Sequence, residues 1–169
     1  MAARAVARCR EVRERAAQTL EIAEEHLGLL DRALDHLTLG RTLLLEAVLV
    51  GQPPALLEEA EGHLDRAVIG LREAGTQHYQ PRGLIARAQL RRVQGRSPDA
   101  QQDLDEAARI ASRGPMPLFQ ADILLERARL HHAQGNPVQA RDFLTQARTL
   151  IENLGYHRRD PDAKVQLEC

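Results

Sequence analysis

The sequence predicts an all-α protein built as a right-handed superhelical stack of antiparallel helical hairpins. Three observations lead to this prediction. Strong helix formers such as Ala, Leu, Glu and Arg dominate, whereas β-branched residues are sparse. Gly and Pro recur at intervals that suit helix ends. One apolar pattern also repeats along the chain. We therefore expect seven helices and a C-terminal helical stub in one domain.

Gly- and Pro-containing segments set the expected helix boundaries. The expected helices are 3–27, 29–50, 55–74, 80–94, 98–113, 117–134 and 137–154, followed by a stub at 161–168. The first is the second half of a partial repeat, and the next six form repeats at 29–74, 80–113 and 117–154. A single glycine, Gly28, separates the first two helices, and one glycine need not break a helix.

The repeated pattern is Ala-x3-Leu-x2-Ala. It occurs four times, beginning at Ala16, Ala60, Ala100 and Ala140, so that successive copies are 44, 40 and 40 residues apart. The three positions of each copy lie on one face of a helix. Two alanines beside a leucine let a neighbouring helix approach closely, and stacked copies bury faces that a single helix cannot.

The adjacent residues His131 and His132 are the most conspicuous candidates for metal binding. They align with Arg91 and Arg92 forty residues earlier, and a ligand pair is not expected to be replaceable by two arginines. Neighbouring helical residues also point about 100° apart, so the two imidazoles do not converge on one ion. We expect no metal, no cofactor and no catalytic residue, and we do not expect an enzyme.

Two further candidate reactive sites, at His36 and at Cys9, are better explained without catalysis. Asp31 or Asp35 beside His36 suggests acid–base chemistry, but no Ser, Cys or Thr stands in a nucleophile motif, so a local ion pair is favoured. Cys9 lies between arginines that could lower its pKa, yet a passive thiol is favoured.

The composition excludes several classes of protein. Lys plus Arg is 23 and Asp plus Glu is 24, without the basic excess of a nucleic-acid binder. Two cysteines give neither a disulfide framework nor a zinc site, and the N-terminus is too charged for a signal peptide. The most apolar run, 42–50, is far shorter than the ~20 residues that span a bilayer. We expect a cytoplasmic protein with no membrane or nucleic-acid partner.

The apolar run 42–50 has two possible interpretations. A helix that is apolar nearly all round is usually covered on several sides, so we expect neighbouring helices to sandwich it. The alternative is a hydrophobic groove that stays open to a partner.

The chain resembles the tetratricopeptide repeat (TPR), a helix-turn-helix hairpin of about 34 residues. A small residue in the first helix matches Ala88 and Ala128, the turn glycine matches Gly95 and Gly135, and the Ala-Leu-Ala triplets match the second helix. The repeats here are longer, and a 40-residue period would also fit HEAT-like repeats, but the turn and the triplets favour TPR.

The chain departs from the TPR pattern in two ways, and it also resembles one group of TPR arrays more closely. Arg87 and Arg127 replace the usual first-helix leucine, and the usual aromatics are mostly Leu, Arg or His. The chain is similar to the C-terminal TPR arrays of bacterial STAND-type NTPases with NACHT-like modules, through the segments 30–44, 63–88, 113–130 and 154–162. This likeness implies a sensor or scaffold arm of a larger signalling NTPase. No Gly-x4-Gly-Lys-Ser/Thr loop is present, so ATP hydrolysis is not implied for these 169 residues.

The resemblance also implies a concave surface lined by the first helices, which would bind a protein or peptide. Carried over by the turn glycines, its lining comprises Arg82, Ile85, Gln89, Arg92, Val93, Asp122, Leu125, Arg129, His132 and Ala133. Three arginines in one channel would suit an acidic peptide or a terminal carboxylate. On this basis Arg92→Ala should weaken binding and leave stability nearly unchanged. An ordinary solvated helix face, a self-assembly module using uncapped terminal repeats, and a small-ligand-binding helical domain are the alternatives.

Overall fold

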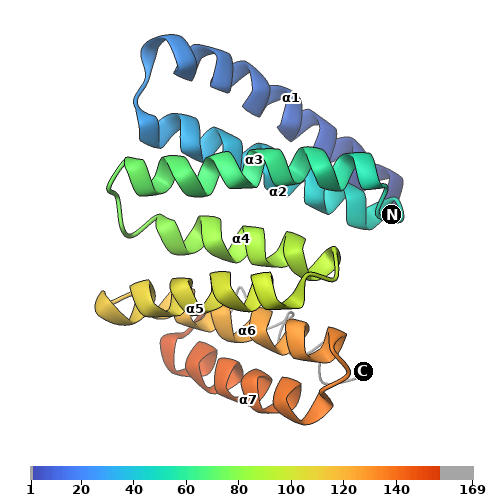
Figure 1. Cartoon of the computed structure of the whole chain (residues 1–169), viewed down its shortest axis with the longest axis vertical. Helices are drawn as coiled ribbons and strands as arrows, with labels where there is room; N and C mark the ends of the chain where they lie inside the picture. Colours follow the sequence, from blue (N-terminus) through green and yellow to red (C-terminus); the bar gives the residue numbers. More distant parts are fainter. Residues whose placement is uncertain (1, 157–169) are drawn as a thin grey trace.

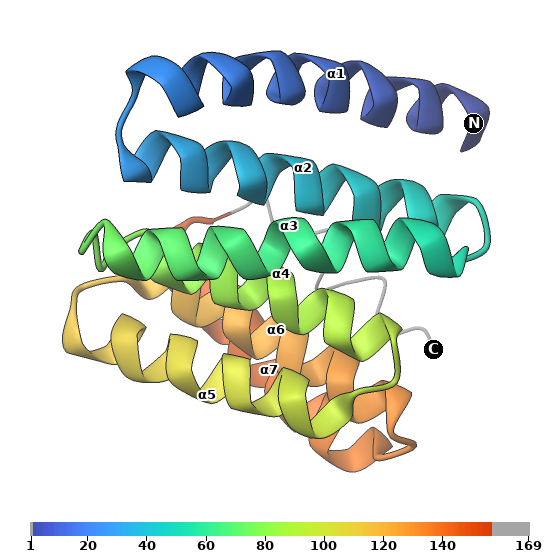
Figure 2. The same cartoon turned by 45° about the horizontal axis from the view of Figure 1, so that its top comes forward.

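The structure, a computed structural model, describes residues 2–156, which form seven helices. They are α1 (Ala2–His26), α2 (Leu29–Leu49), α3 (Pro54–Glu73), α4 (Gln80–Val93), α5 (Ser97–Arg113), α6 (Pro117–Ala133) and α7 (Pro137–Leu154). Consecutive helices run antiparallel and follow one another from α1 at one end to α7 at the other (Figures 1 and 2). The predicted all-α hairpin stack is confirmed, and the stub predicted at 161–168 lies outside the described residues.

The helix ends follow the predicted Gly and Pro signals. The first two helices are separate, as predicted at Gly28, and every observed helix end lies within one residue of its predicted position. Gly95 and Gly135, which follow α4 and α6, both have a φ of 74°, a left-handed conformation that glycine adopts without strain. Proline stands in the first turn of each helix from α3 to α7, where its missing N–H costs nothing.

The Ala-Leu-Ala triplets lie at the contacts between helices. All three residues of the triplets in α3 and α5 are completely buried. Leu20 in α1 and Ala140 in α7, which belong to the outer two copies, are only half buried. The inner copies have helices on both sides, whereas the outer copies lie in the terminal helices of the described stack, so burial follows position in the stack.

The α2–α3 contact is especially close because a glycine faces a leucine of the triplet. A Cβ atom on Gly40 would lie 2.6 Å from Cγ of Leu64, well inside van der Waals contact. Gly70 of α3 likewise approaches Ala33, where an added Cβ would lie 2.9 Å from the alanine methyl. Small residues therefore set the spacing of this pair from both sides.

The even-numbered helices form one side of the stack. Besides the contacts between consecutive helices, α2 packs against α4 and α4 packs against α6. Three successive clusters of buried apolar side chains fill the interior between the hairpins. No helix among residues 2–156 is long and apolar enough to cross a membrane. The common side of α2, α4 and α6 is where the candidate site lies.

Candidate partner-binding groove

Two adjoining hollows open on the side formed by α2, α4 and α6. The first, of about 690 Å³, is lined mainly by α4 and α6 with Arg41 of α2. The second, of about 480 Å³, is lined by all three helices. Arg41 and Gln89 line both hollows, which makes them parts of one surface. We call this surface the groove.

Most of the residues predicted for the concave surface line the groove. Four of them belong to the first hollow: Arg82, Ile85, Gln89 and Asp122. Arg92, Val93 and Arg129 belong to the second. The residues that the turn-glycine register selected on α4 thus lie on the side where the two hollows open.

On α6, the register taken from the turn glycines selected several residues that do not line the groove. Leu125 is buried in the core beside Ala121 and Leu144, and His132 is exposed but lines neither hollow, so both are removed from the candidate site. Ala133 lines neither hollow either. At about 100° per residue, Leu125 and His132 point roughly 60° and 80° away from Asp122 around the helix. A residue four positions after Asp122 faces the groove instead.

That residue is Glu126, a buried carboxylate at the base of the second hollow. Its side chain is 1% exposed. Arg92 Nε donates a hydrogen bond to Glu126 Oε1 at 2.6 Å, and Arg129 Nη1 donates to Oε2 at 3.2 Å. Both carboxylate oxygens are therefore held by guanidinium groups, one from α4 and one from α6. Sequence periodicity did not identify Glu126, because helical spacing gives the face on which a residue lies and not its burial or its partners.

Apolar side chains of α2 form the opposite wall of the second hollow. Leu45 and Val48 line it and are 52% and 46% exposed. Within the same run, Leu43 and Ala47 are completely buried. Both expectations for residues 42–50 therefore hold in part, since one face of the run is covered by neighbours and the other is open in the groove.

Aromatic side chains line the first hollow. Tyr79, Phe119 and Tyr156 contribute from the start of α4, the start of α6 and the end of α7. The guanidinium of Arg82 lies over the Tyr79 ring, 6.0 Å from its centroid. Sequence periodicity did not identify these rings, since they stand at helix ends that only the fold brings together.

The groove is more positive than the chain as a whole. Four arginines and two carboxylates line it: Arg41, Arg82, Arg92, Arg129, Asp122 and Glu126. The whole chain has a formal net charge of −1. The excess of guanidinium groups beside aliphatic and aromatic surface suits carboxylate-bearing ligands.

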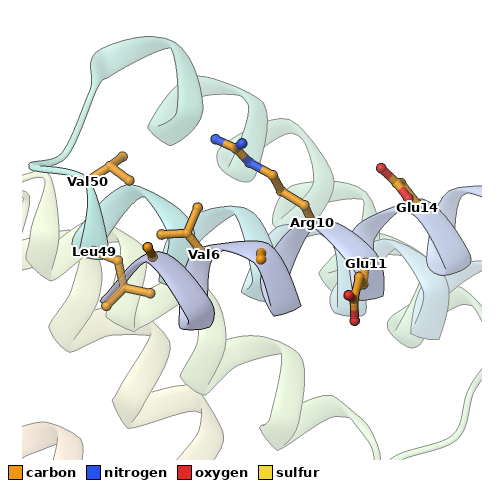
Figure 3. A pocket seen from close by; sticks show the side chains of 8 residues that line it. Val6, Arg10, Glu11, Glu14, Leu49 and Val50 are labelled. Atoms are coloured by element: carbon orange, nitrogen blue, oxygen red, sulfur yellow. The ribbon is translucent and has the colours of Figure 1, made fainter. Parts of the chain in front are cut away.

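A third hollow, of about 590 Å³, lies between α1 and the C-terminal end of α2. Figure 3 shows Val6 of α1 beside Leu49, the last residue of α2, and Val50, which follows it, with Arg10, Glu11 and Glu14 farther along α1. Its apolar lining is a few small or aliphatic side chains. No group of side chains in it points to a particular ligand chemistry.

The histidines show no metal-binding arrangement within the described residues, where no group of three potential ligands occurs. The ring of His131 stacks on Phe143 at a centroid distance of 5.3 Å. His36 contacts His63 across α2 and α3, with 2.9 Å between their Nδ1 atoms. Asp35, the other member of the suspected acid–base pair, accepts a hydrogen bond from Thr19.

Cys9 is a buried thiol. Burial among apolar groups raises its pKa, and the nearby carboxylate of Glu46 raises it further, while Arg13 acts in the opposite direction. A raised pKa lowers the fraction of reactive thiolate. This favours the expected passive thiol over an activated one.

Two further buried carboxylates bind arginines away from the groove. Glu46 of α2 accepts hydrogen bonds from Arg10 and Arg13 of α1, at 2.7 and 3.0 Å. Asp103 of α5 is bound by arginines of α4. Neither carboxylate lines the groove, so both act in holding neighbouring helices together.

Comparison of the chain with protein-family models, with curated proteins and with solved structures found no match.

Proposed function

We propose that this protein is a binding module that holds a protein or peptide partner in the groove formed by α2, α4 and α6, and that it carries out no chemistry of its own. The observation that carries this proposal is the continuity of the two hollows through Arg41 and Gln89. An elongated ligand could contact all three helices at once along such a surface.

The composition of the groove supports this proposal. Arginine and tyrosine are enriched at the centres of protein interfaces, where they combine apolar contact with hydrogen bonding. The groove has four arginines and the rings of Tyr79 and Tyr156, together with the exposed aliphatic side chains of Leu45 and Val48. The resemblance to arrays in STAND-type NTPases extends the proposal: the module would be a cytoplasmic sensor or scaffold arm whose nucleotide chemistry belongs to another domain.

The test uses a matched pair of surface substitutions. Leu45 in the groove and Ile69 on α3 are 52% and 51% exposed, so Leu45→Asp and Ile69→Asp introduce the same charge at equally open sites. Peptides are first selected from a phage-displayed random dodecapeptide library against the wild-type protein. Their affinities are then measured by fluorescence anisotropy with all three proteins. We expect Leu45→Asp to weaken binding about tenfold or more and Ile69→Asp to leave it unchanged.

Equal affinities for the two variants, or loss of binding only with Ile69→Asp, would place the binding surface elsewhere. A thermal-shift series with nucleotides and divalent metals covers the small-ligand alternative, for which an increase of several degrees in Tm is expected. Light scattering as a function of concentration covers self-assembly, because association through an uncapped end raises the apparent mass.

A further inference from the structure

We propose that the Arg92–Glu126–Arg129 cluster makes the groove select partners that carry a carboxylate beside an aliphatic side chain, and that Glu126 limits the strength of this selection. The inference rests on the proposed function, since it assigns a ligand chemistry to the same groove. It also makes Glu126 a specificity-determining residue that acts on the ligand without direct contact.

The geometry gives each member of the cluster a distinct part. Glu126 is buried and binds one guanidinium with each oxygen. The side chains of Arg92 and Arg129 are each 24% exposed and line the second hollow. Each arginine contacts Glu126 through one nitrogen, Nε of Arg92 and Nη1 of Arg129. Glu126 thus fixes the orientation of two cationic groups that remain accessible from the hollow.

The charges and the apolar wall together define the ligand. Arg41, Arg92 and Arg129 line the second hollow, and Glu126 is its only carboxylate among the described residues. Over the whole groove four guanidiniums accompany two carboxylates, Asp122 and Glu126, so an anionic group is favoured there. The aliphatic side chains of Leu45, Val48 and Val93 line the same hollow. A leucine or valine next to a glutamate or aspartate would satisfy both parts of the surface.

Glu126 attenuates this preference because its negative charge opposes an incoming carboxylate. Asp103 provides a matched comparison, since it is also buried and also binds two arginines, Arg87 and Arg91, but lies outside both hollows. Replacing either carboxylate by its amide removes one buried negative charge from a pair of arginines. Only the change at Glu126 alters the potential in the groove.

The experiment measures three fluorescein-labelled octapeptides of the form Xaa-Leu-Xaa-Xaa-Leu-Xaa-Xaa-Leu, with Xaa as Glu, Gln or Lys, by anisotropy at low salt. We expect the Glu peptide to bind the wild-type protein most tightly. Glu126→Gln should tighten binding of the Glu peptide about five- to tenfold relative to the Gln peptide, with the gain reduced at high salt. Asp103→Asn should leave the ratio of the two affinities unchanged.

If Glu126→Gln does not fold, Arg129→Gln provides a second test, in which the expected change in affinity for the Glu peptide has the opposite sign. It should weaken the Glu peptide several-fold and leave the Gln peptide unchanged. The inference is overturned if Glu126→Gln leaves the ratio of affinities unchanged, if Arg129→Gln weakens both peptides equally, or if none of the peptides binds. The proposed function is judged separately, because phage-selected peptides that lose affinity only with Leu45→Asp would support it in each of these cases.

Discussion

Arg87 and Asp103 form a two-point ion pair that joins α4 to α5. Arg87 Nε donates to Asp103 Oδ2 at 3.0 Å and Nη2 donates to Oδ1 at 2.7 Å. Forty residues later the equivalent positions are Arg127 and Phe143, and the guanidinium lies over the aromatic ring, 5.8 Å from its centroid. The arginine at this repeated position therefore packs against the following helix in both hairpins, once by an ion pair and once by stacking.

This relationship predicts how Asp103 can be replaced. Asp103→Ala should lower the free energy of unfolding by about 3–5 kcal/mol, because it removes the anion of Arg91 in a largely buried site and leaves Arg87 only its contact with the more exposed Asp65. Asp103→Phe should cost less than Asp103→Ala, since the ring can stack as Phe143 does. Urea unfolding followed by circular dichroism measures both, and a larger loss for Asp103→Phe would show that the two hairpins do not pack alike.

Two helical glycines should respond in opposite directions to the same substitution. Gly40→Ala should destabilise the fold by about 1–3 kcal/mol, because its methyl would overlap Leu64 in the α2–α3 contact. Gly62→Ala should stabilise it by roughly 0.5–1 kcal/mol, since an added Cβ would meet no side chain and no other helix within 4 Å and alanine favours the helix. The difference between their urea midpoints tests the close packing of α2 on α3. Equal effects would contradict it.

The triplet alanines should not tolerate enlargement. Ala107 is completely buried in the cluster between α4, α5 and α6, so Ala107→Leu should cost about 1–3 kcal/mol through overpacking. Ala17→Leu, at an exposed position of α1, is the control and should change stability by less than about 0.5 kcal/mol. Thermal unfolding of the two variants provides the comparison, and a silent Ala107→Leu would mean that the contact is looser than described.

The His36–His63 contact should make stability depend on pH. Burial lowers the pKa of both imidazoles below the usual 6.5. At His36, the neighbouring His63 and Arg66 lower the pKa further and Glu24 raises it. At His63, Arg66 lowers the pKa further and Glu59 raises it. Because the unfolded chain binds protons more readily, the contribution of the pair is complete above about pH 6.5 and is lost as the pH falls.

Replacing His63 by leucine should therefore flatten the dependence of the unfolding free energy on pH between about pH 7 and 5. His26→Gln is the control, because it removes an imidazole whose side chain is exposed. Urea unfolding at several pH values gives the slope for each protein. A slope that is unchanged by His63→Leu would assign the dependence to other groups.

The structure also revises the expected effect of Arg92→Ala. The sequence suggested a groove side chain whose loss leaves stability nearly unchanged, but Arg92 binds the buried carboxylate of Glu126 at 2.6 Å. We now expect a loss of about 1–3 kcal/mol, moderated because Arg129 still binds the same carboxylate. Unfolding of Arg92→Ala, of Glu126→Gln and of the double variant Arg92→Ala/Glu126→Gln measures this coupling. Additive losses would mean that the ion pair has little energetic weight.

Local chemistry explains why so much of the architecture was predictable. Helix ends depend on the conformations that glycine and proline allow, and Gly95, Gly135 and the N-terminal prolines act within a few residues of chain. The triplets carry their own periodicity, so the faces around Leu64 and Leu104 could be identified before any contact was known. The same register found the groove face of α4, although it missed the phase of α6 at Leu125 and His132.

The sequence by itself therefore determined the helices, their ends and the faces that pack, because each depends on residues close together in the chain. Only the tertiary structure decided which charges meet. Arg92 and Glu126 are 34 residues apart, and nothing in either helix alone indicates that they pair, whereas the i, i+3 spacing of Glu126 and Arg129 allows their contact within α6. The physical reason is that a buried ion pair depends on the distance and solvent exposure set by packing between helices, whereas periodicity records only the face on which a residue lies.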